Sequence, residues 1–132
     1  ATAGVDVELH RALPDLDALA RQVFSPLELQ QLADVPQNAR PAAFLSGWTR
    51  KEAYVKALGV GITEHLPGIC IGLHRADIQV AAVGAIAGTP IHVRSLSAPS
   101  GEYAAVAASF APEVVTITNL ESATLLALSQ RP

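Results

Sequence analysis

The sequence predicts an α+β fold with a mainly antiparallel sheet. A strand-like pattern opens the chain, helical patterns fill residues 14–59, and several short strand-like segments follow. Segregation of strands and helices in this way is typical of α+β folds, whereas regular alternation would indicate a parallel sheet. The 132 residues suit one domain, expected to span 1–132, and a chain of this size buries roughly two thirds of its unfolded surface.

The first ten residues alternate between apolar and polar or small side chains. This period of two predicts a strand with one buried face. One face carries Ala3, Val5, Val7 and Leu9, and the other carries Thr2, Gly4, Asp6, Glu8 and His10.

Two short helices are expected next, over residues 14–24 and 25–35. The second has a well-defined start. Ser25 is a predicted N-cap, Pro26 suits the first helical position, and Glu28 completes a capping box.

A third and longer helix is expected from residue 37 to Gly59. Pro41 is tolerated because it falls in the first turn, and Gly59 supplies the C-terminal stop. Four later segments are rich in β-branched residues and lie between Gly, Pro and Ser turns, which predicts strands. They are residues 68–73, 91–96, 102–110 and 114–120, while residues 76–88 fit either a strand or part of a helix.

Composition excludes several classes of function. The formal net charge is −3, which argues against a nucleic-acid-binding surface, because such surfaces carry a basic excess. No apolar run reaches the ~18 residues that a membrane helix needs, so a cytoplasmic protein is expected. Cys70 is the only cysteine and lies in an apolar run, which favours a small buried side chain. Methionine is absent even at position 1, so the chain is expected to be a piece or module of a longer product.

The long helix concentrates charge around its tryptophan, in a chain with only 16% charged residues. On a helical wheel Lys51 falls inside the apolar stripe, where a lysine must either extend to solvent or meet an anion. Glu52 and Lys56 lie together on the flank of the stripe, and an exposed i, i+4 ion pair is the simplest interpretation. The stripe itself consists of Phe44, Trp48, Val55 and Leu58.

Two carboxylates share one face of the first strand. Asp6 and Glu8 are two residues apart, which separates their Cα atoms by about 6.6 Å. They repel each other unless a proton or cation lies between them, and hard oxygen ligands of this kind suit Mg²⁺. A solvated strand face is the alternative. His10 continues the face and raises a transition-metal alternative, but its Cα lies about 13 Å from that of Asp6, too far for one ion to be held by both.

Other candidates are weaker. The Gly-Val-Gly at 59–61 lacks the rest of a nucleotide-binding fingerprint and fits helix termination better. His65, His74 and His92 show no metal-ligand spacing.

Four segments together resemble the 4'-phosphopantetheinyl transferases. They are "GVDVE" at 4–8, "FSPLE" at 24–28, "FLSGWTRKEAYVKALGVGI" at 44–62 and "GEYAAVAA" at 101–108. With Trp48 and Glu8 at their motif positions, the chain resembles the long, two-lobed type that activates peptide and polyketide synthases. The chain length instead resembles the short, trimeric holo-acyl-carrier-protein synthases. In the long type an N-terminal lobe grips part of coenzyme A, and here only three residues precede the first motif.

The resemblance implies transfer of the phosphopantetheine arm of coenzyme A to a serine of an acyl- or peptidyl-carrier protein, with release of 3',5'-ADP, as in fatty acid or polyketide biosynthesis. Phosphoryl transfer depends mostly on positioning and electrostatics. In the roles implied, Glu52 accepts the serine proton, Lys56 and Lys51 contact phosphate, Trp48 packs the helix in place, and Mg²⁺ is held by Asp6, Glu8 and Glu52.

A local patch is expected to meet the acidic carrier protein, formed by Arg11, Arg21 and apolar residues such as Leu27. Self-association is expected to supply the missing part of the coenzyme A site, with a trimer ahead of a dimer. Two alternatives remain from the sequence: a non-catalytic structural module of a larger synthase, and a metal-dependent hydrolase of small phosphates.

Overall fold

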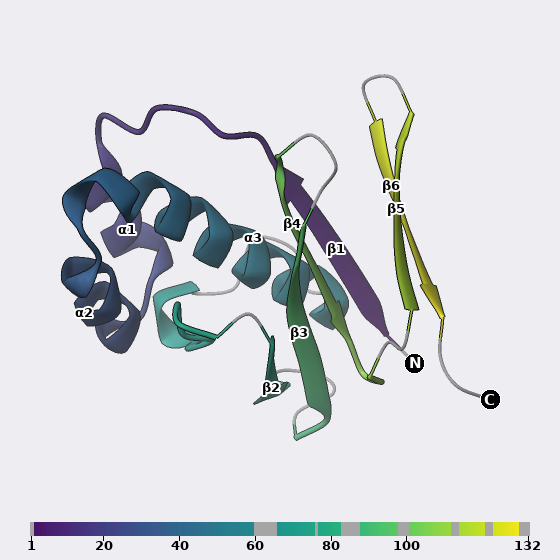
Figure 1. Ribbon diagram of the computed structural model, residues 1–132. Helices are drawn as coiled ribbons and strands as arrows, with labels where there is room; N and C mark the ends of the chain where they lie inside the picture. The colour runs from purple at the N-terminus through teal and green to yellow at the C-terminus, as the bar shows by residue number, and fades with distance from the viewer. Residues whose placement is uncertain are drawn as a thin grey trace.

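A four-stranded antiparallel sheet in the order β1-β4-β3-β2 forms the centre of the computed structural model (Figure 1). Its strands are β1 (Ala3–Glu8), β2 (Asp77–Ala81), β3 (Pro90–Ser97) and β4 (Tyr103–Ala108). The structure describes residues 2–59, 66–75, 77–82, 88–97, 101–111, 114–120 and 123–129. The chain therefore has an α+β fold with an antiparallel sheet, as the sequence predicts.

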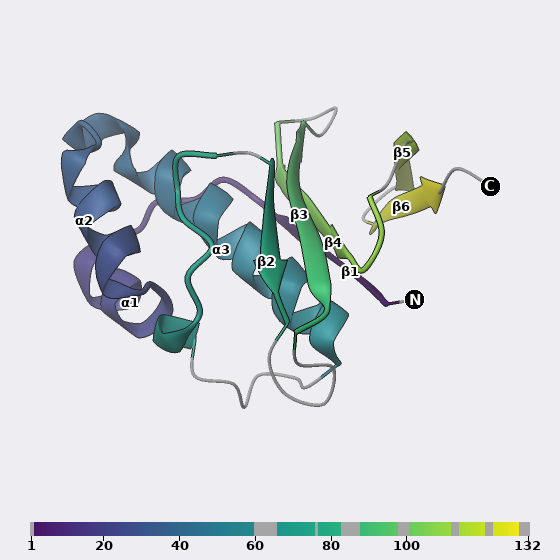
Figure 2. The ribbon, with the colours of Figure 1, turned by 90° about the horizontal axis from the view of Figure 1, so that it is seen from below.

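The long helix α3 (Arg40–Leu58) covers one face of this sheet (Figure 2). It begins after a 3-10 turn at Gln37–Ala39, has Pro41 in its first turn, and ends at Gly59, whose φ of 72° is left-handed. The predicted stop at Gly59 is confirmed, whereas residues 37–39, predicted to start this helix, form the 3-10 turn before it.

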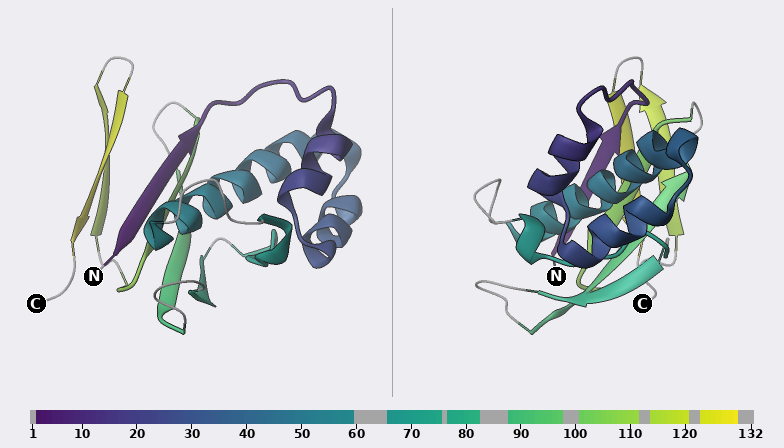
Figure 3. Two further views of the ribbon diagram at one scale, coloured as in Figure 1. Left: turned by 180° about the vertical axis from the view of Figure 1, so that it is seen from behind. Right: turned by 90° about the vertical axis from the view of Figure 1, so that its left-hand side faces the viewer.

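Two shorter helices, α1 (Leu16–Val23) and α2 (Pro26–Asp34), pack around the N-terminal half of α3 (Figure 3). The capping box of α2 is confirmed, because Ser25 Oγ accepts the N–H of Glu28 while Glu28 accepts the N–H of Ser25. A cluster of buried side chains joins the three helices: Ala20, Val23, Phe24, Leu32, Phe44 and Leu45.

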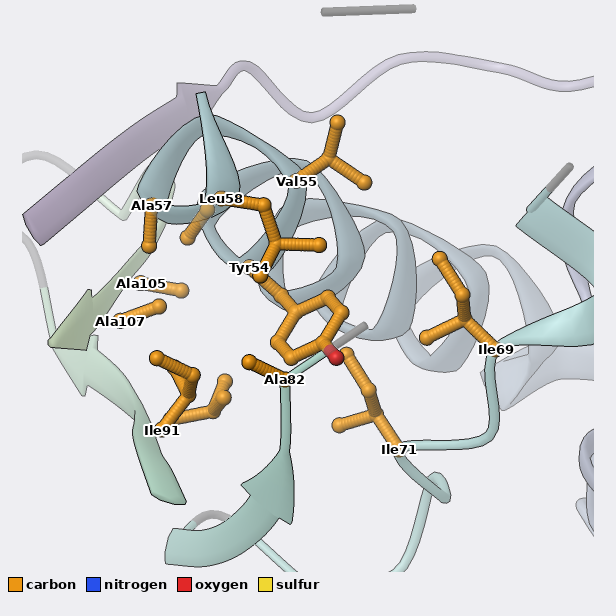
Figure 4. Close-up of a cluster of buried hydrophobic side chains, with 12 residues drawn as sticks. Tyr54, Val55, Ala57, Leu58, Ile69, Ile71, Ala82, Ile91, Ala105 and Ala107 are labelled. Carbon is orange, nitrogen blue, oxygen red and sulfur yellow. The ribbon is translucent and has the colours of Figure 1, made fainter. Parts of the chain in front are cut away.

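The main core lies between α3 and the sheet (Figure 4). Tyr54 is fully buried in its middle. Alanines on β4 let the helix approach the sheet closely, while isoleucines from other segments fill the remaining space. The residues around Tyr54 include Ala53, Ala57, Ile69, Ile71, Ile91, Ala105 and Ala107.

Residues 68–73 were predicted to form a strand, and this prediction is wrong. The segment has a 3-10 turn at Leu66–Gly68 and then an irregular path. Its backbone N–H groups bond side chains of α2 instead of a neighbouring strand, at Ile71, Gly72 and Leu73. Cys70 is exposed rather than buried, because it points outward between two buried isoleucines.

Within residues 76–88 the structure has strand β2 at Asp77–Ala81, and residues 83–87 lie outside the described part. The predicted strand at 114–120 is β5 (Val114–Leu120), and it pairs with β6 (Ala123–Ser129), a strand that the sequence reading missed. This hairpin lies on the opposite side of the sheet from α3 (Figure 1). No helix in the described ranges has the length and apolar character needed to cross a bilayer.

Candidate functional site

The polar face of β1 lies against α3. Gly4 and Asp6 are buried, whereas Val5 and Val7 on the other face are only half-buried. The sequence predicts an open polar face, either solvated or turned to a ligand. Packing reverses this expectation because α3 covers it.

Gly4 explains how the strand and the helix come so close. A Cβ at this position would lie 2.3 Å from the carbonyl oxygen of Ala53 and 2.4 Å from the backbone nitrogen of Ala57. Backbone therefore packs directly on backbone, and only glycine leaves the space.

The spacing of the two motifs follows from this packing. The four residue-to-residue steps from Gly4 to Glu8 along the strand advance about 13 Å. The nine steps from Ala57 back to Trp48 along the helix advance about 13.5 Å. The contact at Gly4 therefore puts Asp6 beside Lys56 and Glu8 beside Trp48.

Asp6 is the buried carboxylate of this group, with 8% of its surface exposed. Its Oδ1 accepts a hydrogen bond of 2.7 Å from Lys56 Nζ, while its buried Oδ2 has no partner among the described residues. Burial raises the pKa of Asp6 to about 6 against the opposing effect of Lys56, and the charges of Glu8 and Glu52 raise it further. The contact with Lys56 therefore does not offset the cost of burying the negative charge of this carboxylate.

Glu8 ends β1, and its Oε1 accepts a 2.8 Å hydrogen bond from the indole Nε1–H of Trp48. Its Oε2 lies 3.5 Å from the half-exposed guanidinium of Arg11. The tryptophan therefore does more than pack the helix, because it also fixes one oxygen of a predicted ligand.

Glu52 follows Trp48 by one helical turn, which puts both on the same side of α3. Burial raises the pKa of Glu52, the charge of Glu8 adds to this increase, and Lys56 opposes it. Asp6, Glu8 and Glu52 therefore influence one another electrostatically, so the structure brings the three predicted metal ligands into one neighbourhood.

Comparison with known proteins identifies the family of the chain. The family model of the 4'-phosphopantetheinyl transferase superfamily matches residues 2–111, which include both motifs. The chain belongs to this superfamily. Its C-terminal hairpin lies beyond the matched range.

Two relatives illustrate the range of phosphopantetheinyl transferases that the chain resembles. The 4'-phosphopantetheinyl transferase HetI of Nostoc sp. is 41% identical over 61 residues, which cover 46% of this chain and 26% of HetI. A holo-[acyl-carrier-protein] synthase of Geobacillus kaustophilus is 43% identical over 68 residues, 48% of this chain and 52% of that protein. The aligned regions thus span about a quarter and about half of these relatives.

Whether Asp6, Glu8 and Glu52 suit a divalent cation depends on their charge and on their present partners. Within the described ranges, no group of three or more His, Cys, Asp or Glu side chains is arranged so that it could hold a metal ion. Lys56 and Trp48 instead hold one oxygen each of Asp6 and Glu8. The buried Oδ2 of Asp6 has no partner among the described residues, and because an unpartnered carboxylate oxygen is costly inside a protein, this oxygen is available to a proton or a cation. Three interacting carboxylates with such an oxygen are a donor set suited to Mg²⁺.

Lys51 does not join these residues, and the predicted phosphate contact is contradicted. Its side chain is 1% exposed, and its Nζ lies 2.6 Å from Glu28 Oε1. The same Nζ donates to the carbonyl oxygens of Val23 and Leu66 at 2.7 and 2.9 Å. The position of Lys51 in an apolar stripe predicts that it either extends to solvent or meets an anion. It does meet an anion, which is the carboxylate of Glu28 rather than a phosphate.

Arg50 was not singled out from the sequence, although it is equally important to the position of α3. It is 3% exposed and donates to the hydroxyls of Ser46 and Ser95 and to the carbonyl oxygen of Gly72. Two consecutive buried cations, Arg50 and Lys51, therefore tie α3 to its surroundings. On the helical wheel Arg50 lies outside the apolar stripe, between Tyr54 and Ala57, so the stripe gave no sign of its role.

His10 pairs with Tyr103, with 2.9 Å between Nδ1 and the hydroxyl oxygen. Tyr103 is the strand partner of Glu8 in the β1–β4 register. The sequence offered the "GEYAAVAA" segment but no role for its tyrosine. His74 is exposed, His92 lies in β3, and His65 is outside the described residues.

Proposed function

We propose that this chain takes part in transfer of the 4'-phosphopantetheine arm from coenzyme A to a serine of an acyl- or peptidyl-carrier protein. Family membership supports the reaction class. The observation that carries the proposal is the group Asp6, Glu8, Glu52 and Lys56 along the seam between β1 and α3.

The reaction forms a bond from the serine oxygen to the phosphorus next to the pantetheine arm. The phosphoanhydride bond breaks, and 3',5'-ADP leaves. Such transfers need charge compensation and alignment more than covalent help from the protein. Mg²⁺, when bound by Asp6, Glu8 and Glu52, would neutralise the pyrophosphate.

Glu52 is the proposed base for the serine proton. Its pKa is raised by burial and by Glu8, and a higher pKa makes a carboxylate a better proton acceptor while it stays ionised. Because Glu52 lies on α3 with Lys56, one rigid helix carries both the base and a phosphate-binding cation.

Lys56 can change partners. Its side chain is 51% exposed, whereas that of Asp6 is 9% exposed. A cation on Asp6 would replace the charge that Lys56 supplies, which frees the ammonium group to contact phosphate and stabilise the leaving group. Lys51, which is buried against Glu28, has no part in this proposal.

The carrier protein and further copies of the chain are the proposed partners. A surface groove of about 460 Å³ at α1 and the start of α3 is lined by Arg21 and Arg40, among other residues. Arg11 and Leu27, the other residues proposed to meet an acidic carrier, are exposed as well, but neither lines this groove. We also propose an oligomer in the cytoplasm, a trimer ahead of a dimer, which light scattering would reveal; a stable monomer that modifies a carrier would contradict it.

Glu52→Gln tests the function. The variant keeps the size and helix propensity of the side chain but removes its charge and basicity. Transfer to an apo carrier, measured by the mass increase of the carrier, should fall by at least about 10²-fold. Asp34→Asn, an exposed change in α2, is the matched control and should transfer normally. Normal transfer by folded Glu52→Gln would remove Glu52 from the mechanism, and absence of transfer by the wild-type chain would favour a non-catalytic module.

A further inference from the structure

Besides the contact between Lys56 and Asp6, a second hydrogen bond connects the strand and the helix that carry the proposed metal ligands. It runs from Trp48 Nε1 on α3 to Glu8 Oε1 on β1, over 2.8 Å. The two residues are 40 positions apart in sequence. No local preference can produce such a bond, so it depends on the packing of β1 against α3.

Glu8 needs external support to hold one orientation. It is the last residue of β1, after which the chain leaves the sheet. A glutamate side chain has several rotatable bonds and loses conformational entropy when it is fixed. Its other described contact, to Arg11, is 3.5 Å long and partly exposed, a kind of ion pair that contributes little.

Trp48 is well placed to give that support. Its ring packs against the buried cluster formed by α1, α2 and α3, which restricts the indole. Glu52 lies one turn further along the same helix, so the residue that holds Glu8 belongs to the element that presents the proposed base. The indole N–H can only donate a hydrogen bond, so it suits a carboxylate oxygen, which can only accept one.

We propose that Trp48 is a positioning residue of the cation site, whose indole N–H holds Glu8 Oε1 so that the second carboxylate oxygen is turned toward the cation. Groups that orient metal ligands in this way commonly affect metal affinity 10–100-fold. The inference rests on the proposed function, because it requires Asp6, Glu8 and Glu52 to hold Mg²⁺. A tryptophan that served packing alone would alter stability and leave affinity for the ion unchanged.

Mg²⁺ binding by the whole chain tests the inference without any assay of activity. Trp48→Phe keeps an aromatic ring but removes the N–H donor. We expect the dissociation constant for Mg²⁺, measured by calorimetry on the folded variant, to rise about 10–100-fold. The matched control is Tyr103→Phe, which removes a hydroxyl that bonds His10 rather than Glu8 and should bind Mg²⁺ normally.

The single tryptophan of the chain provides a second measurement in the wild-type protein. Its ¹⁵N-labelled indole N–H gives one resonance, which should shift with Mg²⁺ at the midpoint found by calorimetry. Glu8→Ala should move this resonance and speed its hydrogen exchange, whereas Glu8→Gln, which keeps an acceptor oxygen, should change it less.

The outcomes separate the two proposals. Mg²⁺ binding by wild type and Trp48→Phe with equal affinity would overturn the positioning role and leave the metal site intact. No saturable Mg²⁺ binding by the wild type would overturn both. If Trp48→Phe fails to fold, the indole resonance of the wild-type chain provides the test. A resonance that does not shift with Glu8→Ala or with Mg²⁺ overturns the inference. A resonance that shifts with both supports it.

Discussion

The Nζ atom of Lys51 lies 2.6 Å from Oε1 of Glu28, and both side chains are 1% exposed. The same carboxylate accepts backbone N–H groups of Ser25, Ile71 and Gly72. Burial alone would raise the pKa of Glu28, but the hydrogen bonds from Lys51 and from the backbone outweigh it and leave the pKa lowered. One ion pair thus joins α2, α3 and the irregular segment at 69–72.

Lys51→Met should destabilise the chain strongly, because it leaves the Glu28 carboxylate buried without its counter-ion. Breaking a buried pair in this way costs about 3–5 kcal/mol, which urea unfolding would measure. The double variant Glu28→Gln with Lys51→Met should recover part of the loss. Arg11→Met removes an exposed ion pair for comparison and should cost about 0–1 kcal/mol. A loss for Lys51→Met no larger than that for Arg11→Met would contradict the structural role.

Asp6 should make the stability of the metal-free chain depend on pH. Its pKa rises from 3.8 to about 6 on folding, so the folded state holds a proton that the unfolded state releases between these values. The contribution of Asp6 to the free energy of unfolding is therefore full below pH 3.8 and falls as pH rises toward 6. At one pKa unit per 1.36 kcal/mol, the loss is about 3 kcal/mol.

Asp6→Asn removes this titration, so the variant should lose less stability than the wild type between pH 4 and about 6.5. Denaturant unfolding at several pH values would show it. Added Mg²⁺ should reduce the difference at the upper end of the range, because a bound cation favours the ionised carboxylate. Parallel pH profiles for the two proteins would show that Asp6 has an ordinary pKa.

Gly4→Ala should disturb both stability and the site. The new methyl group would meet backbone atoms of Ala53 and Ala57, which cannot move without shifting α3. Overpacking of this kind costs about 1–3 kcal/mol, and the shift should also weaken Mg²⁺ binding. Gly47→Ala provides a comparison, because its nearest contacts are side-chain atoms of Leu73 and Phe24 that can adjust. Equal losses in the two variants would argue against a special contact at Gly4.

Coenzyme A should raise the melting temperature more when Mg²⁺ is present than when a chelator is present. A ligand that binds only the folded state stabilises it by mass action, and Mg²⁺ would screen the repulsion between pyrophosphate and the three carboxylates. Scanning calorimetry would measure both conditions. An equal increase in melting temperature would mean that coenzyme A binds without the proposed ion.

Local features of the fold follow from the sequence. The capping box at Ser25 and Glu28, Pro41 in the first turn of α3 and the stop at Gly59 involve residues within a few positions of one another. Their physics is local, so neighbouring residues suffice to predict them. Family membership was likewise readable from motifs that match in order, and the family model confirms it over residues 2–111.

Long-range partners were decided only by the tertiary structure. Alternation along β1 showed that Asp6 and Glu8 share a face, but not that this face lies under α3; the backbone contact at Gly4 makes that possible. Residues 69–73 resemble a strand in composition, yet carboxylate and amide oxygens of α2 bond their N–H groups, across 42 to 44 positions of sequence. Lys51 shows the same principle, because its sequence neighbours required an anion and only the fold chose Glu28 over a phosphate.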